Sequence, residues 1–225
     1  MKPKARIFPV RVWDLKEIAR LYQDVFYEVD PMFRISRPDG LTQALLDRNC
    51  EIWKPYFECS GLERWMKIVV NGKIVAYAAW HHDSKNWHLE YVPPAGSEND
   101  GKSAVPKAAS ILQEDALKLG FSLKRVHIEE EQYLFLAPLL VAKAHRRKGY
   151  GRRLLKNGCK DAIGRSMGCY LMALPDAKEF YVKHGFETVA SYEDETQADA
   201  ELEDGDGPRP LLSTLMRMIN HRIER

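Results

Sequence analysis

The stretch LLVAKAHRRKGYGRRLL, from Leu139 to Leu155, decides how this chain is interpreted. It carries two glycines, Gly149 and Gly151, inside a run of Arg and Lys residues. Three interpretations are open: a basic patch for nucleic acid, a charge run of the targeting type, or a backbone cradle that binds a phosphate. The segments on either side distinguish between them.

The glycines lie between two different patterns. YLFLAPLLV, Tyr133–Val141, is almost continuously apolar, as expected of a strand buried on both faces near the centre of a sheet. From Tyr150 onward apolar residues recur at helical spacing. The first amides of a helix lack intrahelical partners, and glycines let an anion approach them closely. This placement favours a phosphate site, where the flanking Arg and Lys side chains would bind further phosphate oxygens.

The pattern of this loop differs from two well-known phosphate motifs. No Gly-Lys-Ser/Thr sequence closes it, so it is not a P-loop, and it does not match the dinucleotide pattern GxGxxG. Pro138 lies inside the preceding apolar run. Because proline cannot donate a hydrogen bond to a neighbouring strand, we expect a bulge near Pro138.

The N-terminal half contains signals for strands and helices. A strand is expected over residues 5–12, followed by a helix that starts at Asp14 with Glu17 as its capping-box partner. Asn71 and Gly72 separate two β-rich runs, which predicts a hairpin with a type I′ turn. Further helices are expected at residues 40–53 and at residues 107–119, the latter ending at Gly120.

The C-terminal half alternates between strands and helices. The helix after the basic loop is expected to close at Gly168, and CYLMAL, residues 169–174, to form a second buried strand. Asp176 and Glu179 are expected to cap a short helix over residues 177–184. The remaining strands are expected at residues 186–192 and 211–219.

Composition excludes several classes of protein. The 225 residues carry a net charge of only +2, which gives no overall argument for nucleic acid as a partner. The four cysteines lack metal-type spacing, the first residues given lack the apolar core of a signal peptide, and no apolar run approaches membrane length. We therefore expect one α/β domain over residues 1–225, without a metal and without a membrane or nucleic-acid partner. It would be cytoplasmic, with the nucleus as the alternative, and would have long polar loops at residues 82–107 and 193–210.

The stretch Leu139–Leu155, a second buried strand and then FYVKHGF, residues 180–186, resemble in this order the GNAT superfamily of N-acetyltransferases, including its fungal members of unassigned substrate. The resemblance implies a mixed, mostly antiparallel twisted sheet, splayed between its two central strands and flanked by helices. It also implies acetyl-CoA as co-substrate. Leu139, Leu140 and Val141 would contact the acetyl group and pantetheine, with the Val141 backbone as a hydrogen-bonding partner. The pyrophosphate would be surrounded by Arg146, Arg147, Lys148, Gly149, Tyr150, Gly151 and Arg152.

The resemblance assigns Tyr181 as the general acid that protonates the departing thiolate, the alternative being a core aromatic residue. Some members of the superfamily carry a glutamate base in the central strand, but that position here is Phe135. The base is therefore open, and histidine is favoured by its pKa near neutrality. The candidates are His81, His82, Glu90, His127, Glu129 and Glu131.

The function expected is transfer of an acetyl group from acetyl-CoA to a primary amine, most simply a small molecule, by a monomer or homodimer. A protein lysine or N-terminus as acceptor and a non-catalytic acyl-CoA-binding module are the alternatives. The acidic stretch at residues 193–206 is expected to be a solvated loop rather than a device that steers cations. Core or half-buried packing is expected of Trp53, Trp65, Trp80 and Trp87, with the lining of a substrate pocket as the alternative.

Overall fold

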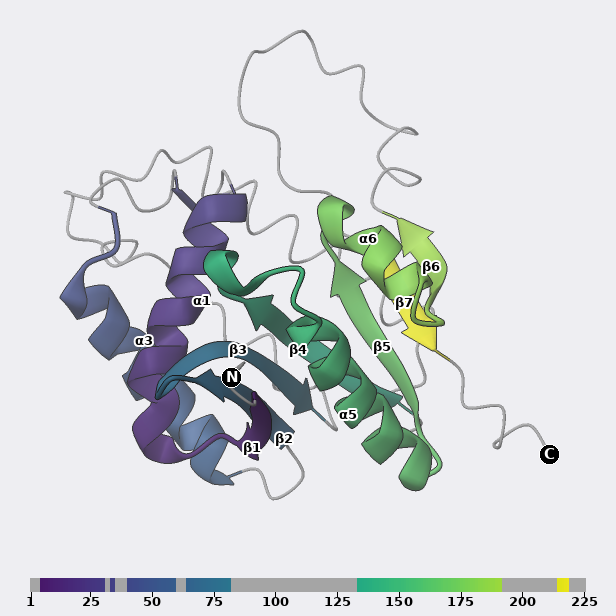
Figure 1. The fold of residues 1–225 in the computed structure, drawn as a ribbon, viewed down its shortest axis with the longest axis horizontal. Coiled ribbons are helices and arrows are strands. Elements are labelled where there is room, and N and C mark those ends of the chain that lie inside the picture. Colours follow the sequence, from purple (N-terminus) through teal and green to yellow (C-terminus); the bar gives the residue numbers. More distant parts are fainter. Residues whose placement is uncertain are drawn as a thin grey trace, which may run out of the picture.

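The computed structural model of the chain describes residues 5–30, 33–34, 40–59, 64–81, 133–191 and 214–218. Within these residues the strands form one seven-stranded sheet in the order β1-β2-β3-β4-β5-β7-β6 (Figure 1). Neighbouring strands run antiparallel except β4 and β5, which are parallel. The expected class, a mixed and mostly antiparallel α/β sheet flanked by helices, is confirmed.

Most elements fall where the sequence patterns place them, and β4 has the bounds of the predicted apolar run. The strands are β1 Arg6–Pro9, β2 Arg64–Val70, β3 Lys73–His81, β4 Tyr133–Val141, β5 Gly168–Ala173, β6 Glu187–Ser191 and β7 Thr214–Met218. The helices are α1 Leu15–Val29, α3 Gln43–Cys59, α5 Tyr150–Gly164 and α6 Pro175–Val182, with 3-10 turns η1 Val12–Asp14 and η4 Lys143–His145.

The β2–β3 hairpin turns as its sequence predicts. Asn71 and Gly72 have φ angles of 51° and 76°, the left-handed values that a type I′ turn needs at both central positions. Asparagine and glycine tolerate these angles best, which is why this pair joins the two strands.

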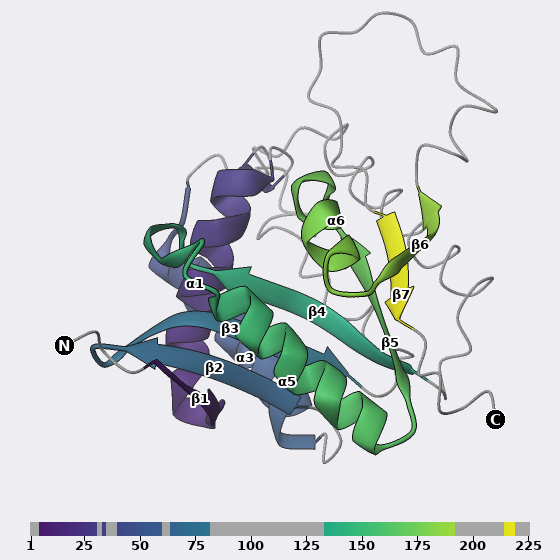
Figure 2. The same ribbon diagram turned by 45° about the vertical axis from the view of Figure 1, so that its right-hand side comes forward.

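Helices cover both faces of the sheet (Figure 2). α5 crosses one face from β2 to β5, while α1 and α3 pack on the other. Alternate residues of β3 divide between the two layers, because side chains along a strand point to opposite faces. Ala78 and Trp80 join the core under α5, whereas Tyr77 and Ala79 join the core under α1 and α3.

Three of the four tryptophans for which core packing was expected are buried in these two layers. They are Trp53, Trp65 and Trp80. Trp87 lies outside the described residues, as do the predicted helix at 107–119 and the long polar loops at 82–107 and 193–210.

The predicted bulge is present in β4. Between the pairs Ala78–Leu139 and Trp80–Leu136, β3 contributes one residue while β4 contributes the two residues Ala137–Pro138. Two residues opposite one define a β-bulge, which bends the strand and increases its twist. The peptide bond within this bulge is cis.

The two central strands separate at the bulge. β4 pairs with β5 in parallel from Tyr133 to Leu136, and the pairing stops there although β4 continues to Val141. Figure 1 shows that β4 and β5 diverge toward the arrowhead of β4. We call this opening the splay. It lies between the two central strands, where the resemblance to the GNAT superfamily implied it.

The predicted capping box of Asp14 and Glu17 is wrong. Asp14 lies in η1, where its carboxylate accepts the backbone N–H of Arg11 at 2.6 Å and pairs with the ammonium group of Lys67. Glu17 accepts the N–H of Ile74 at 2.7 Å and so ties α1 to the hairpin. Both acids therefore make contacts with residues that the local pattern did not include.

Two other predicted helix boundaries are also wrong. α5 ends at Gly164, and Gly168 is instead the first residue of β5, where a Cβ would overlap the ring of Tyr133. α6 begins at Pro175, whose missing N–H costs nothing at a helix start, and no side chain caps it. Asp176 and Glu179 thus lie inside the helix rather than capping it.

Candidate active site

The basic loop turns sharply before α5. Arg147 and Gly149 have φ angles of +61° and +79°, so two left-handed residues flank Lys148. Turns of this kind gather successive backbone N–H groups on one side and form concave sites for anions. A non-glycine residue held at positive φ, such as Arg147, is uncommon and often marks a functional turn.

The N-terminus of α5 follows directly and lacks a side-chain cap. Gly149 is the N-cap residue, and the first bond of the helix runs from the Arg153 N–H to the Gly149 carbonyl at 3.1 Å. The amides of Tyr150, Gly151 and Arg152 therefore precede the hydrogen-bonded ladder and carry the positive end of the helix dipole. A Cβ built on Gly149 meets no atom within 4 Å. The open space beside Gly149, together with backbone N–H groups that have no partner within the helix, would suit a phosphate group.

Three elements converge at the next glycine. A Cβ on Gly151 would lie 3.6 Å from Cγ2 of Val141 and 3.7 Å from Cζ of Phe180. Val141 ends β4 and Phe180 belongs to α6. The start of α5 therefore meets the end of β4 and the face of α6 at one corner, where a ligand could pass from the loop to the splay.

The three β4 residues expected to contact the ligand do not face the same way. Leu139 and Val141 are half-buried and pack with the α5 layer, whereas Leu140 is buried in the core under α1 and α3. The Val141 carbonyl accepts a bond from Nε of Arg146 at 3.3 Å. The structure thus brings the Leu139 and Val141 side chains to the α5 side and places the Leu140 side chain elsewhere.

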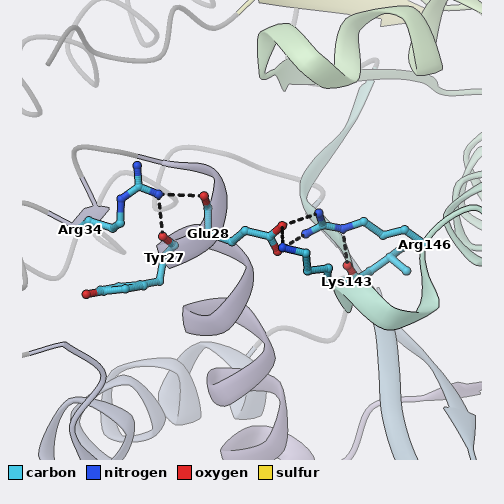
Figure 3. Close-up of polar contacts among 6 residues, drawn as sticks. Tyr27, Glu28, Arg34, Lys143 and Arg146 are labelled. Atoms are coloured by element: carbon cyan, nitrogen blue, oxygen red, sulfur yellow. Dashed lines mark hydrogen bonds and ion pairs between the residues drawn. The ribbon is translucent and has the colours of Figure 1, made fainter.

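Some basic side chains of the loop already have hydrogen-bond partners in the protein, and others are exposed. Both terminal nitrogens of Arg146 donate to the Glu28 carboxylate, at 3.1 and 2.9 Å (Figure 3). Lys148 donates to the Ala144 carbonyl at 2.8 Å. Arg147 and Arg152 are exposed, and within the described part of the chain they make no hydrogen bond or ion pair. They are the loop cations best placed to reach a new anion.

Tyr181 lies against the sheet on the α5 side. It is 7% exposed, and its ring packs edge-on against Phe180 and Phe186, with centroids 5.1 and 5.7 Å away. Burial raises the pKa of its phenol well above the ordinary value. The hydroxyl therefore keeps its proton throughout the neutral and moderately alkaline range.

The position at which some GNAT enzymes carry a glutamate is filled by an aromatic stack. Phe135 is buried and stacks on Tyr170 with ring centroids 4.7 Å apart. Across the strand pair, His81 is also buried, and its Nε2 lies 2.8 Å from the carbonyl oxygen of Ala137 in the bulge. A neutral imidazole with its proton on Nε2 would donate this bond and help to hold the bulge.

The other candidate bases fall outside the described residues. They are His82, Glu90, His127, Glu129 and Glu131. Within the described ranges, no three His, Cys, Asp or Glu side chains gather in a way that could bind a metal. Every helix in the same ranges is too short or too polar to cross a membrane.

Sequence reasoning missed two contributors to this site. Glu28 lies 118 residues before Arg146, and no local pattern links them. Phe180 was read only as part of the motif around Tyr181, and its approach to Gly151 depends on how α6 packs. Glu28 has one weak signal: an acidic residue in the last turn of a helix opposes the helix dipole and so suggests a tertiary partner.

Comparison with known proteins agrees with this geometry. Residues 110–188 match the family model described as Acetyltransferase (GNAT) domain, and none of the curated proteins compared with the chain matches it. Three solved structures illustrate the likeness in fold.

A GNAT-family acetyltransferase from Streptococcus pneumoniae has a TM-score of 0.54 and 17% identity, covering 95% of this chain and 98% of its own. A protein from Salmonella typhimurium solved with its cofactor acetyl-CoA has a TM-score of 0.55 and 14% identity, covering 96% and 94%. A spermidine N-acetyltransferase chimera with a Vibrio cholerae component has a TM-score of 0.53 and 12% identity, covering 98% and 99%. At such identities the likeness shows a shared fold. Together with the family model it confirms the resemblance to the GNAT superfamily.

Proposed function

We propose that this chain is an acetyltransferase of the GNAT type, the family whose model residues 110–188 match, and that it moves the acetyl group of acetyl-CoA directly to the nitrogen of a small primary amine. The observation that carries the proposal is the uncapped start of α5, an anion cradle that meets the end of β4 beside the splay. A thioester bound there would supply the activated acetyl group.

The loop residues would bind the pyrophosphate. The amides of Tyr150, Gly151 and Arg152 point along the positive end of α5, and Gly149 leaves the space beside them open. The exposed guanidinium groups of Arg147 and Arg152 would add charge-assisted bonds to the phosphate oxygens.

The apolar residues at the corner would guide the pantetheine arm. Leu139 and Val141 form one side and Phe180 the other, and all three are half-buried. The bulge at Ala137–Pro138 ends the pairing of β4 with β5, and so frees the strand edge beside which the arm would lie. Water would be excluded there, which strengthens any hydrogen bond to the thioester oxygen.

Tyr181 would donate its phenolic proton to the departing thiolate of CoA. Burial raises the pKa of the phenol, which by itself makes proton release harder. A thiolate leaving into the same apolar surroundings is also poorly solvated, so the pKa of its conjugate thiol rises too. Because the two pKa values shift in the same direction, the transfer stays close to balanced.

The acceptor nitrogen must be neutral when it attacks, although an alkyl amine has a pKa of about 10.4 in water. Phe135 cannot remove its proton, so deprotonation falls to another group or to water. A small amine as acceptor is consistent with the shared fold of the spermidine N-acetyltransferase chimera.

The experiment is thiol release from acetyl-CoA, measured with polyamines, amino acids and aromatic amines, and in parallel with lysine peptides. We expect release that depends on a small amine and yields the acetylated amine by mass spectrometry. Release with peptides alone would make the chain a protein acetyltransferase. Binding of acetyl-CoA without release for any acceptor would make it an acyl-CoA-binding module.

A further inference from the structure

The last turn of α1 reaches the basic loop through one side chain. Glu28 precedes the final residue of the helix, and its carboxylate accepts both terminal nitrogens of Arg146. Lys143 lies 3.0 Å from the same carboxylate (Figure 3). A negative charge at this end of a helix is opposed by the helix dipole, and these two cations offset that unfavourable interaction.

Arg146 is held from two directions. Its terminal nitrogens form the bidentate pair with Glu28, and its Nε donates to the carbonyl of Val141. Val141 ends β4, and Arg146 immediately precedes the left-handed residue Arg147. One guanidinium therefore connects the end of α1, the end of β4 and the beginning of the anion cradle.

Glu28 is itself fixed in place. Nη1 of Arg34 donates to the backbone carbonyls of Tyr27 and Glu28 at 3.0 and 2.8 Å (Figure 3). These are carbonyls of the last helical turn, which have no partner within the helix. With its backbone bound on one side and its carboxylate on the other, Glu28 presents a fixed acceptor to the loop.

We propose that Glu28 is a positioning residue for the cofactor loop, which holds Arg146 as a brace so that the loop backbone, rather than the Arg146 side chain, receives the pyrophosphate. This inference rests on the proposed function, because it assumes that the loop binds acetyl-CoA. It changes the expected role of Arg146 from phosphate ligand to support for the amides that follow it.

Charge balance favours the brace. If Arg146 left Glu28 to bind a phosphate, Lys143 alone would remain paired with a carboxylate that repels the incoming polyanion. It would also give up a bidentate pair, which is the strongest common form of protein hydrogen bond. Paired with Glu28, Arg146 both shapes the loop and, together with Lys143, neutralises that carboxylate.

The two roles predict opposite effects of one substitution. Glu28→Gln removes the negative charge and weakens the bidentate pair. If Arg146 is a brace, calorimetry should show that CoA binds about tenfold more weakly, the loss expected from one charge-assisted bond that no longer orders the loop. If Arg146 is a phosphate ligand, Glu28→Gln frees it, and the affinity for CoA should stay the same or increase. That result would overturn the proposal.

A second test exchanges the charges of Glu28 and Arg146. Arg146→Glu alone should bind CoA far more weakly than the wild type. Adding Glu28→Arg should restore part of the affinity, because the pair can form again in reverse. A brace can be rebuilt in this way, whereas a lost phosphate ligand cannot. No recovery in the double variant, with the fold intact by circular dichroism, would contradict the proposal.

Two controls separate the possible failures. Glu179→Gln makes the same substitution on α6, in an exposed ion pair with Lys183 just past the helix end, and should leave CoA affinity unchanged. Wild-type protein that fails to bind CoA would refute the proposed function itself. Wild-type binding together with an unaffected Glu28→Gln variant would refute only the role of Glu28.

Discussion

The indole of Trp80 lies directly against the backbone of Gly158. A Cβ placed on Gly158 would overlap Cε2, Nε1 and Cζ2 of this ring. Trp80 is on β3 and Gly158 is in the middle of α5, and both are buried. The contact sets how closely α5 approaches the sheet, and therefore where the anion cradle at its N-terminus lies relative to β4.

Replacing Gly158 with alanine should destabilise the fold despite the better helix propensity of alanine. The added methyl group has no space, and overpacking of this kind costs about 1 to 3 kcal/mol in free energy of unfolding. Chemical denaturation measures this. Gly164→Ala is the matched control, because Gly164 is the last residue of α5 and a Cβ there meets nothing within 4 Å. This substitution should leave the free energy of unfolding unchanged or raise it slightly. Equal effects of both substitutions would contradict the close contact.

Removing the Asp14 side chain should be costly. Asp14 and Lys67 form an ion pair whose side chains are only 10% and 11% exposed. Asp14→Ala would leave the Lys67 ammonium group buried without this partner, and breaking such a pair costs about 3 to 5 kcal/mol. Glu179→Ala, which breaks the exposed pair with Lys183, should change the free energy of unfolding by less than about 1 kcal/mol. A small loss at Asp14 would show that the Lys67 ammonium group finds another partner.

Replacing Tyr181 with phenylalanine should separate binding from chemistry. The substitution removes only a hydroxyl, so packing against Phe180 and Phe186 is retained, and acetyl-CoA affinity should change little. Loss of a general acid should lower kcat by about 10² to 10⁴-fold. Steady-state kinetics and calorimetry on the same protein test this. An unchanged kcat would make Tyr181 a core aromatic residue, the alternative that the sequence left open.

The raised pKa of Tyr181 predicts how stability depends on pH. In the unfolded chain tyrosine loses its proton near pH 10, while the buried phenol of the folded protein holds it. Above that pH the folded state binds more protons than the unfolded state, so stability falls as the pH rises further. The free energy of unfolding of the wild type should therefore decline more steeply between about pH 10 and 11 than that of Tyr181→Phe. Parallel curves would contradict the burial of the hydroxyl.

The parts of the site that the sequence predicted depend on local chemistry. The bulge follows from the missing N–H of Pro138, and the cradle follows from Gly149 at the start of an amphipathic helix. The hairpin follows from Asn71-Gly72. In each case the residue type itself determines which backbone conformations or hydrogen bonds are open to it, so a single sequence is enough to predict the feature.

The parts that it did not predict depend on tertiary contacts. Asp14 and Glu17 resemble a capping box, but Asp14 pairs with Lys67 on β2 and Glu17 binds the hairpin backbone, and these contacts override the local preference. Gly168 resembles a helix terminator, yet it is glycine because the Tyr133 ring covers it. The pairing of Glu28 with Arg146 likewise exists only once α1 has packed beside the loop.

The measurement that tests the central claim most directly is thermal unfolding with and without acetyl-CoA, for the wild type, Gly149→Glu and Gly40→Glu. Gly40 shares the positive φ of Gly149 and the same open surroundings, but it precedes α3 on the opposite face of the sheet. At 100 times the dissociation constant, acetyl-CoA should stabilise the wild type and Gly40→Glu by about 2.7 kcal/mol. It should not stabilise Gly149→Glu, whose carboxylate would occupy the cradle. Equal stabilisation of all three proteins, or of none, would contradict the assignment of this loop as the acetyl-CoA site.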